Sequence, residues 1–148
     1  MAQFVREVMT PTVTSVRPDA SLVEAAQLMR VQDIGDVLVA KEGQLIGVLT
    51  DRDIVMRAVA DGVDPLTVSC QSVCTPKPIT VSPDDEVTVA INLMRTHAVR
   101  RLPVAEAGRP LGIVTLGDLA QEQDPDSALA DISRAAPDTW PGGAATQP

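Results

Sequence analysis

The first half of this chain is repeated in its second half, 65 residues later. When residues 8–53 are placed on residues 73–118, 16 of the 46 aligned positions carry the same amino acid and no gap is needed. Average amino-acid usage gives roughly three matches by chance. The stretch "GVLTDRDI" falls on "GIVTLGDL", so Gly, Thr and Asp recur in register. The fold must therefore accommodate two copies of one supersecondary unit.

Each copy has the pattern β-α-β-β-α. Short apolar strands are expected at 13–16 and 79–81, each stopped by a Pro-Asp pair. A helix follows, opened in the first copy by Ser21 with Glu24 three residues later, which is a capping box. Two strands joined by a glycine-containing turn come next, "VLVA" and "LIGVL" in one copy, "LPVA" and "LGIV" in the other. A second helix closes each copy, and in the first it stops at Asp61-Gly62.

This pattern predicts an α+β fold of two β-α-β-β-α repeats related by a pseudo-twofold axis. We place repeat 1 at 4–62, repeat 2 at 63–122 and a flexible acidic tail at 123–148. A unit of this size buries too little surface alone. The two sheets are therefore expected to pack together, which creates two related clefts between the repeats.

Composition narrows the classes of partner. The 148 residues carry a net charge of −8 and two aromatic side chains, Phe4 and Trp140. Such an acidic chain repels phosphate backbones and lacks platforms for stacking bases, so nucleic-acid binding is not expected. No run approaches the length of a membrane span, and the N-terminus has no apolar region typical of a signal peptide. We expect a soluble, cytoplasmic protein.

The two copies resemble cystathionine β-synthase (CBS) domains. The stretches that carry the resemblance run from "VMTPTVTSV" to "GVLTDRDI" and from "VCTPKPITV" to "GIVTLGDL". Together they look like a CBS pair, or Bateman module, over roughly residues 4–122. The chain is similar to stand-alone bacterial CBS-pair proteins. The resemblance implies a regulatory, non-enzymatic role and a homodimer formed through the helices as a flat disc.

The resemblance also implies adenosine binding at Thr50 and Asp53, and at Thr115 and Asp118. In the family the Asp carboxylate accepts the ribose hydroxyls and the Thr hydroxyl supports ribose or phosphate. The chemistry is sound, since one carboxylate can accept from two hydroxyl donors. A plainer interpretation stays open: each Thr-x-x-Asp is also a capping box, which stabilises a helix without any ligand.

The two candidate sites differ in charge. In nucleotide-binding relatives, a cleft combines the Asp of one repeat with the first strand and the residues before the second strand of the other. The cleft of Thr50 and Asp53 is therefore expected to gain Arg100 and Arg101, with help from Arg52, and Pro78, Ile79 and Thr80 should line its base pocket. The second candidate site consists of Thr115, Asp118, Val13 and Thr14. It is expected to meet Asp36, which would repel phosphate. A solvated or ion-paired role for the two arginines stays open.

The remaining features are less informative. Cys70 and Cys74 align with Val5 and Met9 on a short helical turn, so they are expected to be small core residues; a redox role is the weaker alternative. His97 ends a helix and has no cluster of metal ligands around it in the sequence, so no metal is expected. In the tail, "DSALADISRAA" could form a short helix, and Trp140 could dock on a partner.

These observations favour a sensor of an adenosine-containing ligand, with AMP, ADP or ATP first and S-adenosylmethionine or NAD next. No bound cofactor is expected, and the effector protein that responds to the sensor is not identified by the sequence. The alternative is a structural or protein-interaction module with no small-molecule ligand.

Overall fold

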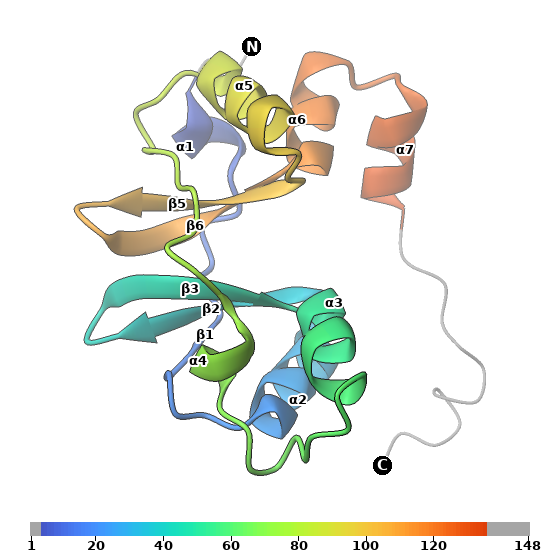
Figure 1. Cartoon of the computed structure of the whole chain (residues 1–148). Coiled ribbons are helices and arrows are strands. Elements are labelled where there is room, and N and C mark those ends of the chain that lie inside the picture. The colour runs from blue at the N-terminus through green and yellow to red at the C-terminus, as the bar shows by residue number, and fades with distance from the viewer. Residues whose placement is uncertain (1–3, 136–148) are drawn as a thin grey trace.

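The computed structural model describes residues 4–135, and it is a mixed α+β structure (Figure 1). The first repeat contains α1 (Val5–Val8), β1 (Ser15–Val16), α2 (Leu22–Gln32), β2 (Asp36–Lys41), β3 (Gln44–Thr50), α3 (Asp51–Ile54) and a π-helical turn, η1 (Val55–Val59). The second contains α4 (Cys70–Val73), β4 (Thr75–Pro76), α5 (Val87–His97), β5 (Arg101–Glu106), β6 (Arg109–Thr115) and α6 (Leu116–Gln123). A last helix, α7 (Ala128–Arg134), follows. The α+β class and the two repeated units confirm the prediction.

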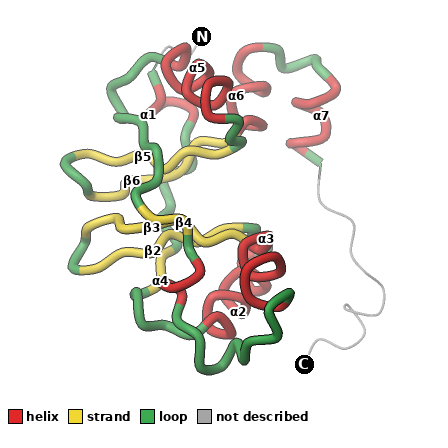
Figure 2. Tube along the Cα trace, viewed as in Figure 1, coloured by secondary structure: helices red, strands yellow, loops and turns green. Residues whose placement is uncertain are grey.

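The two antiparallel hairpins, β2–β3 and β5–β6, form the centre of the molecule. Their registers match residue for residue, and the ladders shift at equivalent places, between Val39 and Ala40 and between Val104 and Ala105. The hairpins stack on each other with the helices outside them (Figure 2). The Leu45 N–H donates to the Gly108 carbonyl at 2.9 Å, which links β3 to the turn of the other hairpin. The duplication in sequence is therefore a duplication in backbone geometry.

The first strand of each repeat is shorter than the sequence suggests. β1 pairs in parallel with β2, Ser15 lying opposite Leu38. In the second repeat the expected strand at 79–81 is reduced to one parallel bridge between Val81 and Val104. The connection through the helix nevertheless has the same course in both repeats.

The repeats exchange their first helical turns. α1 packs into the core of the second repeat, where Val5 is fully buried and its N–H donates to the Asp85 carbonyl at 2.9 Å. α4 packs into the core of the first repeat, where Cys70 is fully buried and its N–H donates to the Ala20 carbonyl at 2.7 Å. The strand β4, which follows α4, extends the first sheet to the order β1-β2-β3-β4. Packing thus crosses the sequence boundary drawn between 62 and 63.

Two separate aliphatic cores result from this exchange. The buried residues of the first core are Val16, Ala20, Leu22, Ala25, Met29, Val37, Val39, Leu49, Ala58, Cys70, Val73 and Cys74. Those of the second are Val5, Val81, Val87, Ala90, Met94, Leu102, Val104, Val114 and Leu119. Each core needs side chains from both halves of the chain, because neither sheet is covered by its own repeat alone.

The helix ends agree with the expected signals. Ser21 Oγ accepts the Glu24 N–H at 3.1 Å at the start of α2, and Gly62 has φ +72° just after the helix that begins at Asp51. Residues 128–134 of the expected tail form α7, which packs on α6 with Ala130 fully buried. Trp140 and the rest of the tail beyond 135 lie outside the described residues. Within the described residues, no helix is both long and apolar enough to cross a membrane.

Candidate functional site

A cleft of about 900 Å³ opens between the two repeats. Its walls come from the β3–α3 junction, from the segment after β4, and from the end of α5 with the start of β5. The residues predicted for the first site that line this cleft are Thr50, Arg52, Asp53, Pro78, Ile79, Arg100 and Arg101. Thr80 is exposed and is not among the lining residues. The fold therefore brings most of the predicted set together from segments up to 51 residues apart in the chain.

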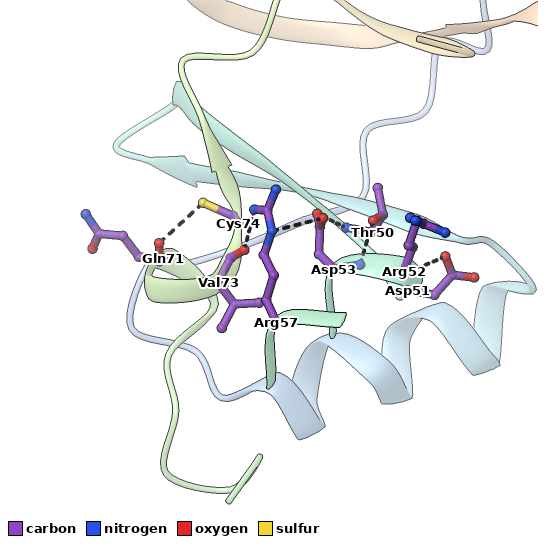
Figure 3. A network of polar contacts seen from close by, with 8 residues as sticks. All are labelled: Thr50, Asp51, Arg52, Asp53, Arg57, Gln71, Val73 and Cys74. Carbon is purple, nitrogen blue, oxygen red and sulfur yellow. Dashed lines mark hydrogen bonds and ion pairs between the residues drawn. The ribbon is translucent and has the colours of Figure 1, made fainter. Parts of the chain in front are cut away.

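Thr50 and Asp53 form a reciprocal cap at the start of α3 (Figure 3). The Asp53 N–H donates to Thr50 Oγ1 at 3.0 Å, and the Thr50 N–H donates to Asp53 Oδ2 at 3.0 Å. The capping-box interpretation is thus realised in the structure. The capping hydrogen bonds leave Asp53 able to accept further donors from a ligand, because each carboxylate oxygen has a second lone pair and Asp53 lies at the cleft wall.

The other oxygen of Asp53 faces Arg57. The Arg57 Nε lies 3.7 Å from Asp53 Oδ1, and the same guanidinium donates through Nη1 to the Val73 carbonyl at 3.0 Å (Figure 3). Val73 belongs to α4, the turn that the second repeat contributes to the first core. Arg57 therefore connects the candidate site to the exchanged segment.

The cleft carries charges of both signs. Its basic side chains are Arg52, Lys77, Arg100 and Arg101, and its carboxylates are Asp36, Asp51 and Asp53. His97 also lines the cleft. Sequence reasoning missed Lys77 and set His97 aside as a helix-end residue. The available signal was their position, since Lys77 precedes the predicted base pocket directly and His97 lies three residues before Arg100.

The structure places Asp36 in the first cleft, where the sequence did not lead us to expect it. Asp36 was expected to repel phosphate at the second site, but it lines the first cleft, where its Oδ1 lies 3.3 Å from Arg101 Nη1. Asp36 and Arg101 occupy equivalent positions of the two repeats, as the first residues of β2 and β5. Equivalent positions near a twofold axis face each other, so the two side chains meet across it.

The second candidate site has the same cap but a different surrounding. The Thr115 N–H donates to Asp118 Oδ2 at 2.9 Å, and the Asp118 N–H donates to Thr115 Oγ1 at 3.0 Å. The Thr14 hydroxyl donates to the Gln32 amide oxygen at 2.6 Å, and Val13 is half-buried. None of Thr115, Asp118, Val13 and Thr14 lines the 900 Å³ cleft.

The family model for the CBS domain matches this chain twice, at residues 5–60 and at residues 70–124. The chain belongs to the CBS-domain family. The two CBS repeats are the two units described above, and the resemblance inferred from "GVLTDRDI" and "GIVTLGDL" is confirmed.

Known CBS proteins resemble most of this chain. The CBS domain-containing protein YhcV of Bacillus subtilis is 38% identical over 133 residues, covering 87% of this chain and 94% of that protein. Hypoxic response protein 1 of Mycobacterium tuberculosis is 36% identical over 131 residues, covering 88% and 91%. A crystal structure of Hypoxic Response Protein I with two coordinated zinc ions has a TM-score of 0.74 at 37% identity, covering 80% of this chain and 97% of that one.

A further solved structure shares the fold at lower identity. It is the CBS domain pair of protein MJ0100 in complex with 5′-methylthioadenosine and S-adenosyl-L-methionine, with a TM-score of 0.76 and 22% identity, covering 86% of this chain and all of that one. At that identity the likeness concerns the CBS-pair fold alone.

The two cysteines lie in the first CBS core, as expected for core residues. Both are buried, and burial raises the pKa of the Cys70 thiol to about 11 and also raises the pKa of Cys74. A thiolate is the reactive form of cysteine, so this environment is typical of a structural rather than a redox-active residue. Among residues 4–135, no group of three or more His, Cys, Asp or Glu side chains is placed to hold a metal ion.

Proposed function

We propose that this CBS pair is a regulatory sensor that binds an adenosine-containing ligand, with AMP, ADP or ATP first, in the cleft of Thr50 and Asp53. We further propose that it does so in the cytoplasm, as a homodimer, and without catalysing a reaction. One observation carries the proposal: a cleft of about 900 Å³ between the repeats joins Thr50 and Asp53 to basic side chains contributed by the other repeat.

Size and chemistry both support this ligand class. Small-molecule sites have volumes of roughly 300–1,000 Å³ and combine apolar walls with a few polar groups. Here the apolar wall includes Val48, Ile79 and Ile113, which suits a base, while Arg52, Arg100 and Lys77 suit phosphate. The MJ0100 pair, which has the same fold, is a complex with two adenosine compounds.

The alternative is a CBS pair that binds no small molecule. It is favoured by the capping bonds of Thr50 and Asp53, because these side chains have a structural role that needs no ligand. The two functions differ in one measurable respect, which is whether an adenosine compound raises the melting temperature of the purified protein.

A thermal-shift series tests the proposal. The ligands are adenosine, AMP, ADP, ATP, S-adenosylmethionine and NAD. A ligand at 100 times its dissociation constant stabilises the native state by about 2.7 kcal/mol. For a chain of this size the midpoint rises by roughly 5–10 °C, at 2–4 °C per kcal/mol. If none of the six compounds shifts the midpoint, the interaction-module alternative is correct.

Matched variants locate the site. Asp53→Asn keeps an oxygen that can accept the Thr50 N–H but removes the charge that holds two hydroxyl donors. Asp118→Asn makes the same change at the second cap. The ligand-induced shift should largely vanish in Asp53→Asn, shrink in Arg100→Ala and persist in Asp118→Asn. The reverse pattern for the two Asp variants would place the ligand at the second candidate site.

A further inference from the structure

The charges of Asp36 and Arg101 meet where the two CBS repeats face each other. Each is the first residue of a hairpin strand: Asp36 of β2 and Arg101 of β5. The contact is a single one, Arg101 Nη1 to Asp36 Oδ1 at 3.3 Å. This is longer than the usual 2.7–2.9 Å of a strong charge-assisted hydrogen bond, and it is not the bidentate arrangement that arginine forms with a well-matched anion.

Asp36 is poorly compensated in this position. Its side chain is only 12% exposed. Its Oδ2 atom is buried and has no hydrogen-bond partner within residues 4–135. Burial raises the pKa of Asp36, Arg101 opposes the rise, and the Asp51 carboxylate of α3 adds to it. A buried charge with an unsatisfied oxygen is costly, so Asp36 depends on the one arginine.

Arg101 has access to the cleft as well as to Asp36. Its side chain is 38% exposed and lines the cleft, along with Arg52, Arg100 and Lys77. A phosphate that enters would meet a guanidinium already engaged by a carboxylate. Since arginine pairs with phosphate in a bidentate way, a phosphate-bearing ligand can outcompete a single contact of 3.3 Å, whereas an uncharged nucleoside cannot.

We propose that Asp36 is a specificity-determining residue of this cleft: it competes with an anionic ligand for Arg101, so that displacing the carboxylate lowers the affinity for phosphate, while the affinity for an uncharged nucleoside is unaffected. The inference deepens the proposed function and rests on it for the adenosine part of the ligand, but its phosphate part is testable alone. In the ligand-free protein Arg101 neutralises Asp36. In the complex Arg101 turns to the phosphate, and Asp36 is left with a second anion nearby.

Calorimetric titration of matched variants gives the first test. Asp36→Asn is nearly isosteric and frees Arg101. Asp61→Asn makes the same change of net charge at an exposed residue that does not line the cleft. The probes are adenosine, AMP and inorganic tripolyphosphate. We expect Asp36→Asn to bind AMP and tripolyphosphate about tenfold more tightly than wild type, with adenosine changed less than twofold and Asp61→Asn unchanged for all three. If both variants gained the same affinity for AMP and tripolyphosphate, the effect would come from net charge alone, and the proposal would be overturned.

The carboxyl ¹³C signal of Asp36 gives a second test in the wild-type protein, which does not depend on the folding of any variant. The charged groups facing Asp36 are Arg101 from β5 and Asp51 from α3, and the other ionisable side chains of the cleft are Arg52, Asp53, Lys77, His97 and Arg100. Saturating tripolyphosphate should raise the titration midpoint of Asp36, because Arg101 leaves it. Arg101→Gln should show the raised midpoint without any ligand. If tripolyphosphate binds and the midpoint stays, or if neither wild type nor Asp36→Asn binds it, the inference is wrong.

The outcomes separate this inference from the proposed function. Tripolyphosphate binding that tightens in Asp36→Asn, with no affinity for adenosine or AMP, would support the role of Asp36 and refute the nucleotide sensor. Nucleotide binding with the same affinity in wild type and in Asp36→Asn would support the nucleotide sensor and refute the role of Asp36.

Discussion

Gly47 and Gly112 show at the scale of single residues how the exchanged segments are held. Gly47 of β3 lies opposite Pro76 of β4, and a methyl group on it would overlap the thiol of Cys74. Gly112 of β6 adjoins the bridge between Thr10 and Ile113, and a methyl group there would overlap the Thr10 carbonyl. Glycine at this repeated position therefore admits a neighbouring segment of the chain.

Alanine at these glycines should destabilise the protein. Overpacking in a well-packed site costs about 1–3 kcal/mol, and both Gly47→Ala and Gly112→Ala should lower the midpoint of urea unfolding accordingly. Cys74→Ala should restore part of the loss in Gly47→Ala, because a side chain causes much of that overlap. No side-chain change can relieve Gly112→Ala, where the obstacle is backbone. An unchanged midpoint for Gly112→Ala would show that the Thr10 segment can move aside freely.

Asp36 should make stability depend on pH. Its pKa is raised in the native state, mainly by burial, so the native state binds this proton more tightly than the unfolded chain does. Its contribution to stability is therefore favourable at low pH and is lost as the pH rises through the raised native pKa. Asp36→Asn should melt above wild type near neutral pH, and the difference should shrink as the pH falls toward the ordinary value of 3.8. Melting curves over this range check it, with Asp61→Asn as the control. A constant difference would rule out Asp36 as the titrating group.

Among the elements, α7 differs from the others in having no counterpart in the first repeat. It packs on α6, its Ser133 lying against Gly117, the residue equivalent to Arg52 of the first repeat. Its buried residue is Ala130, while Leu129 and Ile132 are exposed. A short helix fixed mainly to one neighbour is expected to open without unfolding the cores.

Hydrogen exchange on a variant of α7 tests that expectation. Ala130→Asp places a charge in the contact with α6, so amide protection over residues 128–134 should be lost while the strands of both hairpins keep theirs. Ile132→Asp changes an exposed residue of the same helix and should leave the protection in place. A loss of protection in β2 or β5 in the Ala130→Asp protein would instead make α7 part of the cooperative core.

At the scale of the whole molecule, apolar side chains remain uncovered on the first repeat. Val55, Met56 and Val59 of η1 are each more than half exposed, as is Val31 of α2. The equivalent helix of the second repeat, α6, carries α7. The helical surface of the first repeat is thus the candidate for contact with a second copy.

A homodimer should form through the η1 part of that surface, which consists of Val55, Met56 and Val59. Light scattering at micromolar concentration should give about twice the chain mass of 15.6 kDa. Val59→Asp should shift the mass to that of a monomer, because it places a charge in the apolar contact, and Val31→Asp should leave the dimer intact. A monomeric wild type would contradict the prediction, and a monomer from Val31→Asp alone would move the interface to α2.

Sequence periodicity and caps predicted most of the local structure. Ser21, Thr50 and Thr115 all begin helices as predicted, and the hairpins follow from short apolar runs on either side of a glycine-containing turn. β4 was not predicted, because two residues, Thr75 and Pro76, carry no periodic pattern and form a strand only where β3 offers an edge. Most of the cleft was anticipated from the resemblance to nucleotide-binding CBS pairs.

The pairing of Asp36 with Arg101 was beyond reach from the sequence. The alignment set these residues on equivalent positions, but it held no information on which equivalent positions approach the pseudo-twofold axis. The exchange of α1 and α4 was not predicted for the same reason. Val5 and Cys70 occupy equivalent positions of the two repeats, and the alignment does not show in which core each of them is buried.

That exchange has a consequence for how the protein is made. Val5 bonds to Asp85, 80 residues later, and a ribosome adds about 5–20 residues per second. The N-terminal turn can therefore reach its place in the second core only after several seconds, when Asp85 has been synthesised, and the first core must likewise wait for Cys70, 50 residues after its partner Ala20. A translation product that stops before Cys70 leaves the buried Val5 without its core and the first core without α4. Because both halves belong to one chain, each exchanged turn and the core that receives it are produced in equal number and in the same place.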